Sequence, residues 1–280
     1  YPGSFSSTDN RCIGHKLAEM ETAEQAYKND SASGITDTAK PVITVAHLNK
    51  KFGKNKVLND FNIALNKGET LVVLGRSGAG KSVLIKLIIG LMEPDAGTID
   101  VLGYDVPSLD HEGLDKLRSR VGFLFQSNAL YDSMTVRENL EFPMRRHMSE
   151  LTPEEVEKTI MEVLTNVGLP QTIDMLPSEL SGGMQKRIAL ARTLVLKPEI
   201  ILYDEPTTGL DPITGKEICM LIVEVQKKYN TSSIIISHDM RCVEITADRV
   251  AVLIEGRNYA TGTFDELKQT NDSKVKAFFE

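Results

Sequence analysis

The stretch "ETLVVLGRSGAGKSVLIKLIIGL" (residues 69–91) decides the fold of this chain. An apolar strand runs into a glycine-rich loop and the loop into a helix, which is the context that the pattern G-x-x-x-x-G-K-[ST] requires. Backbone N–H groups of such a loop wrap phosphates, Lys81 adds positive charge, and Ser82 offers a hydroxyl to Mg²⁺. A chance glycine loop is the alternative, and the flanking elements argue against it. We expect nucleotide phosphates to contact Gly75, Arg76, Ser77, Gly78, Ala79, Gly80, Lys81, Ser82 and Val83.

The rest of the chain supplies a sheet for this loop. Further apolar strands are predicted at 121–125, 200–204, 233–237 and 249–254, and strands that alternate with helices imply a mostly parallel α/β sheet. Alternating residues at 42–48 and 61–65, with turn residues and basic charge at 50–58, predict a small antiparallel sheet. The segment from about 127 to 197 is mainly helical, for example at 153–168. No internal repeat is visible, so the chain holds one set of motifs.

Composition limits the function classes. The 280 residues carry a formal net charge of −7, which argues against a protein that coats nucleic acid. Cys12, Cys219 and Cys242 are far apart and odd in number, so we expect reduced thiols in the cytosol. No run reaches the ~18 apolar residues of a membrane span, and the first residues do not resemble a signal peptide. Residues 1–40 are polar and predict a flexible, solvated leader.

Polar side chains follow three of the predicted strands. "IILYDE" (200–205) ends in two acids, of which Asp204 is expected to hold Mg²⁺ and Glu205 to polarise the attacking water. Gln126 follows the strand at 121–125 and can bind Mg²⁺ or that water, and His238 follows the strand at 233–237 and can sense the terminal phosphate. Taken alone, these residues would more often be surface acids or a structural histidine. Phe52 can stack on a base, although an aromatic residue near a turn more often belongs to the core.

The stretch "ELSGGMQKRIALA" (179–191) is predicted to be helical from Met184 on. Ser181, Gly182 and Gly183 stand before that helix, where two glycines cost backbone entropy. A helix N-terminus with free N–H groups is an anion site, which makes this a second candidate phosphate site in the same chain.

Together these motifs resemble the ATP-binding-cassette (ABC) ATPases over residues 42–265. The resemblance implies an α/β P-loop NTPase cassette with a RecA-like core, an antiparallel β subdomain and a helical subdomain. It identifies "LSGGMQ" (180–185) as the signature motif and "GLD" (209–211), with Asp211, as the D-loop. It gives catalytic roles to Lys81, Gln126, Glu205 and His238, with ATP and Mg²⁺ as cofactors. Two copies would pair head to tail, so that Ser181, Gly182 and Gly183 serve the partner's nucleotide.

This resemblance sets the expected domain limits. Residues 1–40 are the leader, 41–265 the nucleotide-binding domain with a helical subdomain at about 127–197, and 266–280 a C-terminal tail.

A narrower resemblance concerns "FLFQSNALYDSMTVRENLEFPMRRH" (123–147) and "KPEIILYDEPTTGLDPIT" (197–214). Both are similar to the ATPase subunits of Mla/Mce-type phospholipid transporters. This implies a peripheral protein on the cytoplasmic face of the inner membrane, with a separate permease and an MCE-type lipid-binding subunit as partners and no nucleic acid. Gln185 stands where the family has a basic residue, and Ser237 where Thr is common.

Three other functions stay open. The chain can be the ATPase of another transporter for solutes, lipoproteins or drugs, a cassette that acts on ribosomes or DNA, or a nucleotide-binding regulator without turnover. The missing repeat disfavours the second, and the presence of Lys81, Glu205 and His238 disfavours the last.

Overall fold

The computed structural model describes residues 40–280. The expected leader, apart from its last residue, and Cys12 lie outside the described residues. Cys219 and Cys242 are buried free thiols, as their spacing predicts. No helix within residues 40–280 has both the length and the apolar character needed to cross a membrane.

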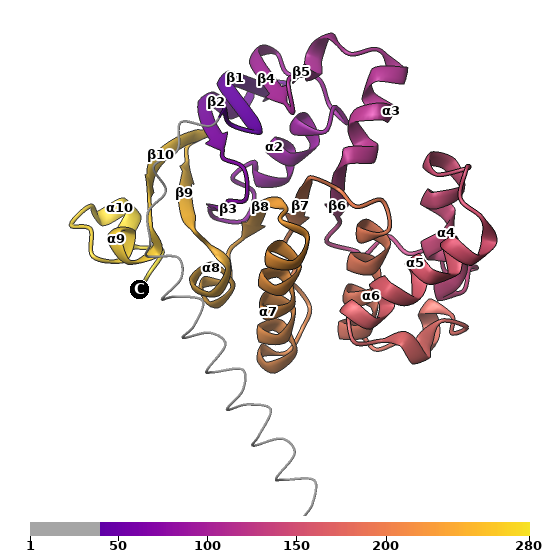
Figure 1. Cartoon of the computed structure of the whole chain (residues 1–280). Helices are drawn as coiled ribbons and strands as arrows, with labels where there is room; N and C mark the ends of the chain where they lie inside the picture. The colour runs from indigo at the N-terminus through magenta and orange to yellow at the C-terminus, as the bar shows by residue number, and fades with distance from the viewer. Residues whose placement is uncertain (1–39) are drawn as a thin grey trace, which may run out of the picture. The chain divides into compact units, whose positions relative to one another are not determined.

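A six-stranded sheet forms the centre of the described part, in the order β10-β9-β3-β8-β7-β6 (Figure 1). Five strands are parallel and β10 pairs antiparallel with β9, at one edge. Every residue of β3, β7 and β8 is buried, so these strands read as continuous apolar runs in the sequence. The strand bounds are β3 (Thr70–Leu74), β6 (Val121–Leu124), β7 (Ile200–Asp204), β8 (Ser232–Ser237), β9 (Arg249–Ile254) and β10 (Arg257–Gly262).

A four-stranded antiparallel sheet in the order β2-β1-β4-β5 confirms the predicted second sheet. Its strands are β1 (Ile43–Phe52), β2 (Asn55–Leu65), β4 (Ala96–Val101) and β5 (Tyr104–Asp105). The expected turn at 50–58 is wrong in extent, because β1 and β2 pair up to Phe52 and Asn55 and leave Gly53 and Lys54 as the turn. The basic residues of this hairpin are mostly solvated, so they do not prevent strand pairing.

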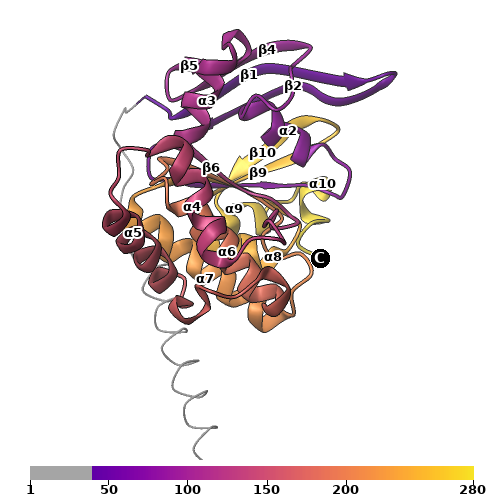
Figure 2. The same ribbon diagram turned by 90° about the vertical axis from the view of Figure 1, so that its right-hand side faces the viewer.

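The helix α2 (Lys81–Ile88) lies between the two sheets, and α7 (Pro212–Tyr229) and α8 (Met240–Thr246) cover the other face of the central sheet (Figures 1 and 2). Buried residues of α2 join both sheets in one hydrophobic core. Outside the helical segment, the described residues also form α3 (His111–Arg120), α9 (Phe264–Lys268) and α10 (Ser273–Lys276). The 3₁₀ turns of the described residues are η1 (Val106–Ser108), η2 (Pro170–Thr172) and η3 (Pro177–Glu179). The domain limits at 265 and 266 remain a prediction.

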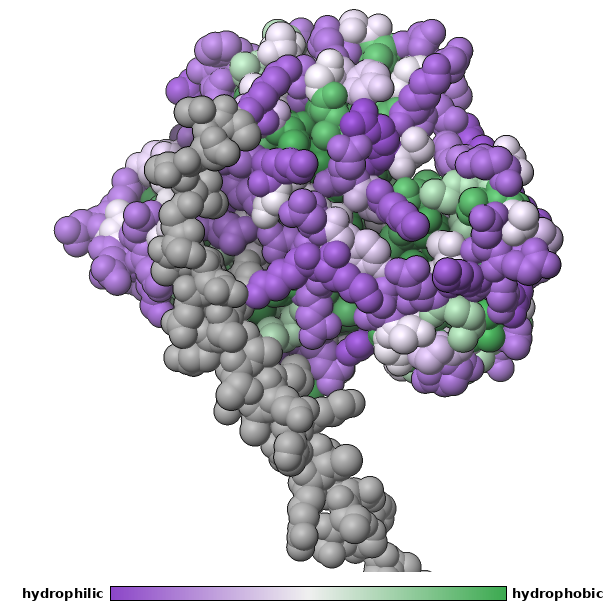
Figure 3. Space-filling view, viewed as in Figure 1, coloured by the Kyte–Doolittle hydropathy of each residue, from purple (hydrophilic) through white to green (hydrophobic). Residues whose placement is uncertain are grey.

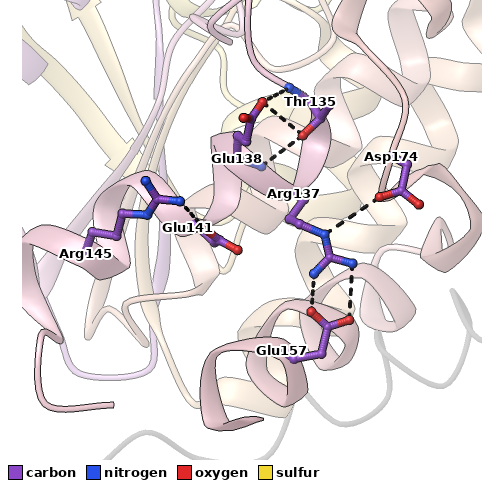
Figure 4. A network of polar contacts seen from close by, with 7 residues as sticks. All are labelled: Thr135, Arg137, Glu138, Glu141, Arg145, Glu157 and Asp174. Atoms are coloured by element: carbon purple, nitrogen blue, oxygen red, sulfur yellow. Dashed lines mark hydrogen bonds and ion pairs between the residues drawn. The ribbon is translucent and has the colours of Figure 1, made fainter. Parts of the chain in front are cut away.

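The predicted helical segment holds α4 (Val136–His147), α5 (Pro153–Asn166) and α6 (Gly182–Leu194). Thr135 begins α4 with a capping box in which its hydroxyl and the Glu138 carboxylate satisfy free N–H groups (Figure 4). Arg137 on α4 makes a forked ion pair with Glu157 on α5 and lies 3.7 Å from the Asp174 carboxylate. One guanidinium therefore ties together two helices and the loop after η2.

Candidate functional site

The glycine loop 75–80 joins β3 to α2, as predicted. Gly78 and Gly80 have left-handed φ values of 77° and 101°, which favour glycine. A Cβ on Gly80 would lie 2.5 Å from the Val57 side chain, so this glycine also lets β2 approach the loop. Gly80 begins α2 without a side-chain cap, which leaves N–H groups for an anion.

Lys81 is buried and surrounded by oxygen atoms. Its ammonium donates hydrogen bonds to the carbonyls of Gly75 (2.6 Å) and Arg76 (3.1 Å), and lies 3.5 Å from Glu205 Oε1. These contacts fix the Lys81 ammonium beside the glycine loop. A phosphate in the loop would meet the ammonium there.

Ser82 and Asp204 meet at the end of β7. The Ser82 hydroxyl donates to Asp204 Oδ1 at 3.0 Å. Burial raises the pKa of Asp204 above its usual value, although the bond from Ser82 opposes the rise. A hydroxyl and a carboxylate are ligands that Mg²⁺ accepts when phosphate oxygens and water complete its shell. Within residues 40–280 no group of three or more His, Cys, Asp or Glu could hold a metal.

Glu205 links the lysine to the histidine. It is buried, and its Oε2 lies 2.8 Å from His238 Nδ1. Its φ of 51° is unusual for a residue with a side chain, and such strain gathers at functional sites. β3, β8 and β7 are neighbouring parallel strands, so their carboxyl ends lie side by side. The structure therefore brings together, at this end of the sheet, Lys81, Ser82, Asp204, Glu205 and His238.

Gln126 and Phe52 lie around this cluster. Gln126 is exposed in the turn after β6, which neighbours β7, and its backbone carbonyl accepts a hydrogen bond from Lys186 at 2.6 Å. Phe52 is 48% exposed at the end of β1, with the Lys50 ammonium 5.7 Å from its ring centre. Its ring is therefore accessible and lies on the same hairpin as Val57, which contacts the glycine loop.

The second candidate phosphate site lies elsewhere in the fold. The stretch from Met184 on is helical, as predicted, and α6 begins two residues earlier at Gly182. Ser181 is its cap, and the Ser181 hydroxyl accepts from the Met184 N–H at 3.3 Å. A Cβ on Gly183 would lie 2.5 Å from the Thr214 methyl group, so one glycine serves the packing of α6 on α7. Asp211 caps α7. No hydrogen bond or ion pair of the described residues joins Ser181, Gly182, Gly183 or Asp211 to the lysine cluster.

Sequence reasoning missed three residues near the site, namely Thr207, Asp239 and Lys186. Asp239 accepts from the Thr207 hydroxyl at 3.0 Å and caps α8, which fixes the backbone beside His238. Lys186 is buried on α6, and burial lowers its pKa to about 8, although the charge of Asp204 opposes the drop. The polar run "QKR" (185–187) gives no sign that its middle residue is buried.

The chain is similar to known proteins over most of its length. Residues 58–208 match the family described as "ABC transporter". The chain is 37% identical over 239 residues to the "Intermembrane phospholipid transport system ATP-binding protein MlaF" of Haemophilus influenzae, covering 85% of this chain and 90% of that one. It is 36% identical to the "Probable ribonucleotide transport ATP-binding protein mkl" of Mycobacterium tuberculosis, over 84% of this chain and 66% of that one.

A solved structure has the same fold. It is the dimeric ATP-binding cassette MJ0796 in a post-hydrolysis state with ADP and Pi, with a TM-score of 0.72 and 29% identity over 79% of this chain and 98% of that one.

Proposed function

Because this chain belongs to the ABC transporter family and is an ATP-binding ATPase of that family, we propose that it powers phospholipid transport between membranes together with a separate permease. The observation that carries the proposal is the match to MlaF, which spans 90% of that protein. The segment "SNALYDSMTV" (127–136) after Gln126 supports the same subfamily. An MCE-type lipid-binding subunit and a place on the cytoplasmic face of the inner membrane follow from this proposal.

The cluster around Lys81 suits hydrolysis of ATP. Lys81 and the free N–H groups of α2 would bind the phosphates, while Ser82, Asp204 and the Gln126 side chain would hold Mg²⁺, which neutralises phosphate charge when bound. Glu205 would orient the attacking water, and His238 keeps that carboxylate in place through its 2.8 Å contact. Phe52 would stack on the base.

Ser181, Gly182, Gly183 and Asp211 would act on the nucleotide of a second copy. Ser181, Gly182 and Asp211 are exposed, and none of the four bonds to the lysine cluster of its own chain. The helix dipole of α6 favours an anion at this end. A head-to-tail pair would therefore place one ATP between the glycine loop of one copy and the start of α6 of the other.

A groove beside the helical segment is suited to a permease. It has a volume of about 360 Å³ and is lined mainly by apolar residues of β6, of α4 and of the loops after α2, β6 and α6, with polar side chains from α3 and α6 beside them. Figure 3 shows hydrophobic surface in the hollow between the part that carries α3 and the part that carries α4. The rings of Tyr131 and Phe142 pack against each other in it at an angle of 54°, with ring centres 5.0 Å apart, and the two residues stay 44% and 46% exposed. An apolar helix of a partner would bury these rings.

The test is a mild-detergent pull-down of the tagged chain from its native membranes, with mass spectrometry of proteins and lipids. We expect a permease, an MCE-domain protein and phospholipid. The variant Phe142→Glu should lose the permease because it places a charge in the groove. Leu176→Glu, at an exposed apolar residue outside the groove, is the control and should keep the permease.

The other outcomes separate the rival functions. A permease with a different binding protein would mean that the transported molecule is not a phospholipid. The chain would then be the ATPase of a solute transporter, the second candidate function, which the 36% identity to mkl favours. Ribosomal proteins or DNA in place of a permease would contradict the transport function.

A further inference from the structure

Helix α6 is bound to the loop that carries Gln126 through backbone carbonyls of that loop. Lys186 on α6 is 2% exposed, and its ammonium donates to the Gln126 carbonyl at 2.6 Å and contacts the Phe125 carbonyl at 3.5 Å. No carboxylate of residues 40–280 forms an ion pair with it. The charge is therefore satisfied by peptide oxygens of the loop.

A second cation of α6 holds the next part of the same loop. The Arg192 guanidinium donates to the carbonyls of Ala129 (2.7 Å) and Asn128 (3.1 Å). Asn128 and Ala129 have φ values of 62° and 51°, a conformation that residues with side chains rarely adopt. The loop after β6 thus keeps a strained backbone whose carbonyls are bound by α6.

A lysine is a costly choice at this position. Burial penalises its ammonium, as the lowered pKa of about 8 shows. A methionine would fill a similar volume without that penalty. The charged side chain therefore needs a reason beyond packing. Its contacts supply one, because its shortest bond is to the backbone of Gln126, the residue proposed above to help hold Mg²⁺.

We propose that Lys186 is a positioning residue for Gln126. By fixing the Gln126 carbonyl, the ammonium sets the direction of the side chain, and it makes the turn after β6 move together with α6, the helix that begins with Ser181 and the two glycines. When the partner's nucleotide binds at the start of α6, a shift of α6 would in this way change the position of Gln126. This inference rests on the role proposed above for Gln126.

The test measures kcat and KM for ATP in the full chain and in three single variants of α6. Lys186→Met should lower kcat about 10- to 100-fold, the loss expected when a catalytic group shifts by an ångström, with KM within about twofold. Lys186→Arg should recover most of kcat because a guanidinium can donate to the same carbonyl. Arg187→Met is the matched control, since Arg187 is the next cation of α6 but bonds to Glu217 and Val167, and it should keep kcat.

A double-mutant cycle separates this role from a purely structural one. Gln126→Ala should lower kcat, and Lys186→Met should add no further loss in that background. Additive losses, or a parent kcat in Lys186→Met while Gln126→Ala is impaired, would overturn the inference alone. A parent kcat in Gln126→Ala would instead overturn the proposed role of Gln126. If Lys186→Met does not fold, the comparison of Lys186→Arg with its double variant decides the question.

Discussion

Asp204 shows at the scale of one residue how the site is built for a ligand. Burial raises its pKa, so the folded chain holds a proton on this carboxyl more tightly than the unfolded chain does. The stability from this group is present below the unfolded pKa and is lost as pH rises through the folded pKa. Above the folded pKa the ionised carboxylate therefore destabilises the free protein until a cation binds beside it.

We predict that Asp204→Asn stabilises the free protein by about 0.5–2 kcal/mol, because the amide keeps the shape and can still accept from Ser82 without a buried charge. It should also lose the stabilisation by Mg-ATP, which for the parent reaches about 2.7 kcal/mol at 100 times Kd. Thermal unfolding with and without Mg-ATP measures both effects. An unchanged response to Mg-ATP would contradict the assignment of Asp204 to the metal.

Residues at the ends of strands were open to prediction, whereas residues inside the helical segment were not. Lys81, Asp204, Glu205 and His238 each follow a buried apolar run, and parallel strands bring their carboxyl ends to one edge. Lys186 stands among polar residues of a helix, where the sequence alone does not show which side chain is turned inward. Its role depends on the fold of a loop about 60 residues earlier.

At the scale of elements, the start of α6 combines two demands. Ser181 caps the helix and leaves its first N–H groups accessible, while Gly183 packs against α7. The Thr214 side chain that faces Gly183 is fixed by a hydrogen bond of 2.5 Å to the Asp211 carboxylate. Asp211 therefore shapes the contact between the two helices.

We predict that Gly183→Ala destabilises the chain by about 1–3 kcal/mol, because its Cβ would overlap a Thr214 methyl group that cannot easily move away. Gly182→Ala is the matched control, since its Cβ meets the Leu210 side chain at an ordinary 3.7 Å, and it should be neutral or stabilise the helix by up to about 1 kcal/mol. Urea unfolding compares the two. Equal stabilities would show that Gly183 is not required for packing.

Strands with a clear apolar pattern in the sequence were predicted, and strands without one were not. β3, β7 and β8 are buried at every position. In contrast, β10 is half exposed and the first three residues of β4 are exposed, so both resemble loops in the sequence. The hairpin of β1 and β2 extends farther than predicted, because cross-strand pairing outweighs the low strand preference of its lysines and asparagines.

At the scale of the whole molecule, the chain carries a complete hydrolytic cluster and a separate set of signature residues. The cluster around Glu205 brings together the Lys81 ammonium, the Ser82–Asp204 pair and the His238 ring at the carboxyl end of the central sheet. Ser181 and Asp211 contact their own helices and not that cluster. Under the proposed function, a second copy would supply the start of α6 to each of these clusters.

We predict that Glu205→Gln holds ATP in a stable dimer, because the amide keeps the contacts of the carboxylate but orients the attacking water poorly. ATP turnover should fall by about 100- to 10,000-fold, the range for loss of a general base. Size-exclusion chromatography with light scattering should show a dimer with Mg-ATP and a monomer with Mg-ADP. In the same background Ser181→Arg should restore the monomer, since a long side chain at the exposed start of α6 would block the partner's phosphate. Hydrolysis by Glu205→Gln at the parent rate would mean that another group orients the water, and a dimer that survives Ser181→Arg would mean that the two copies meet through a different surface.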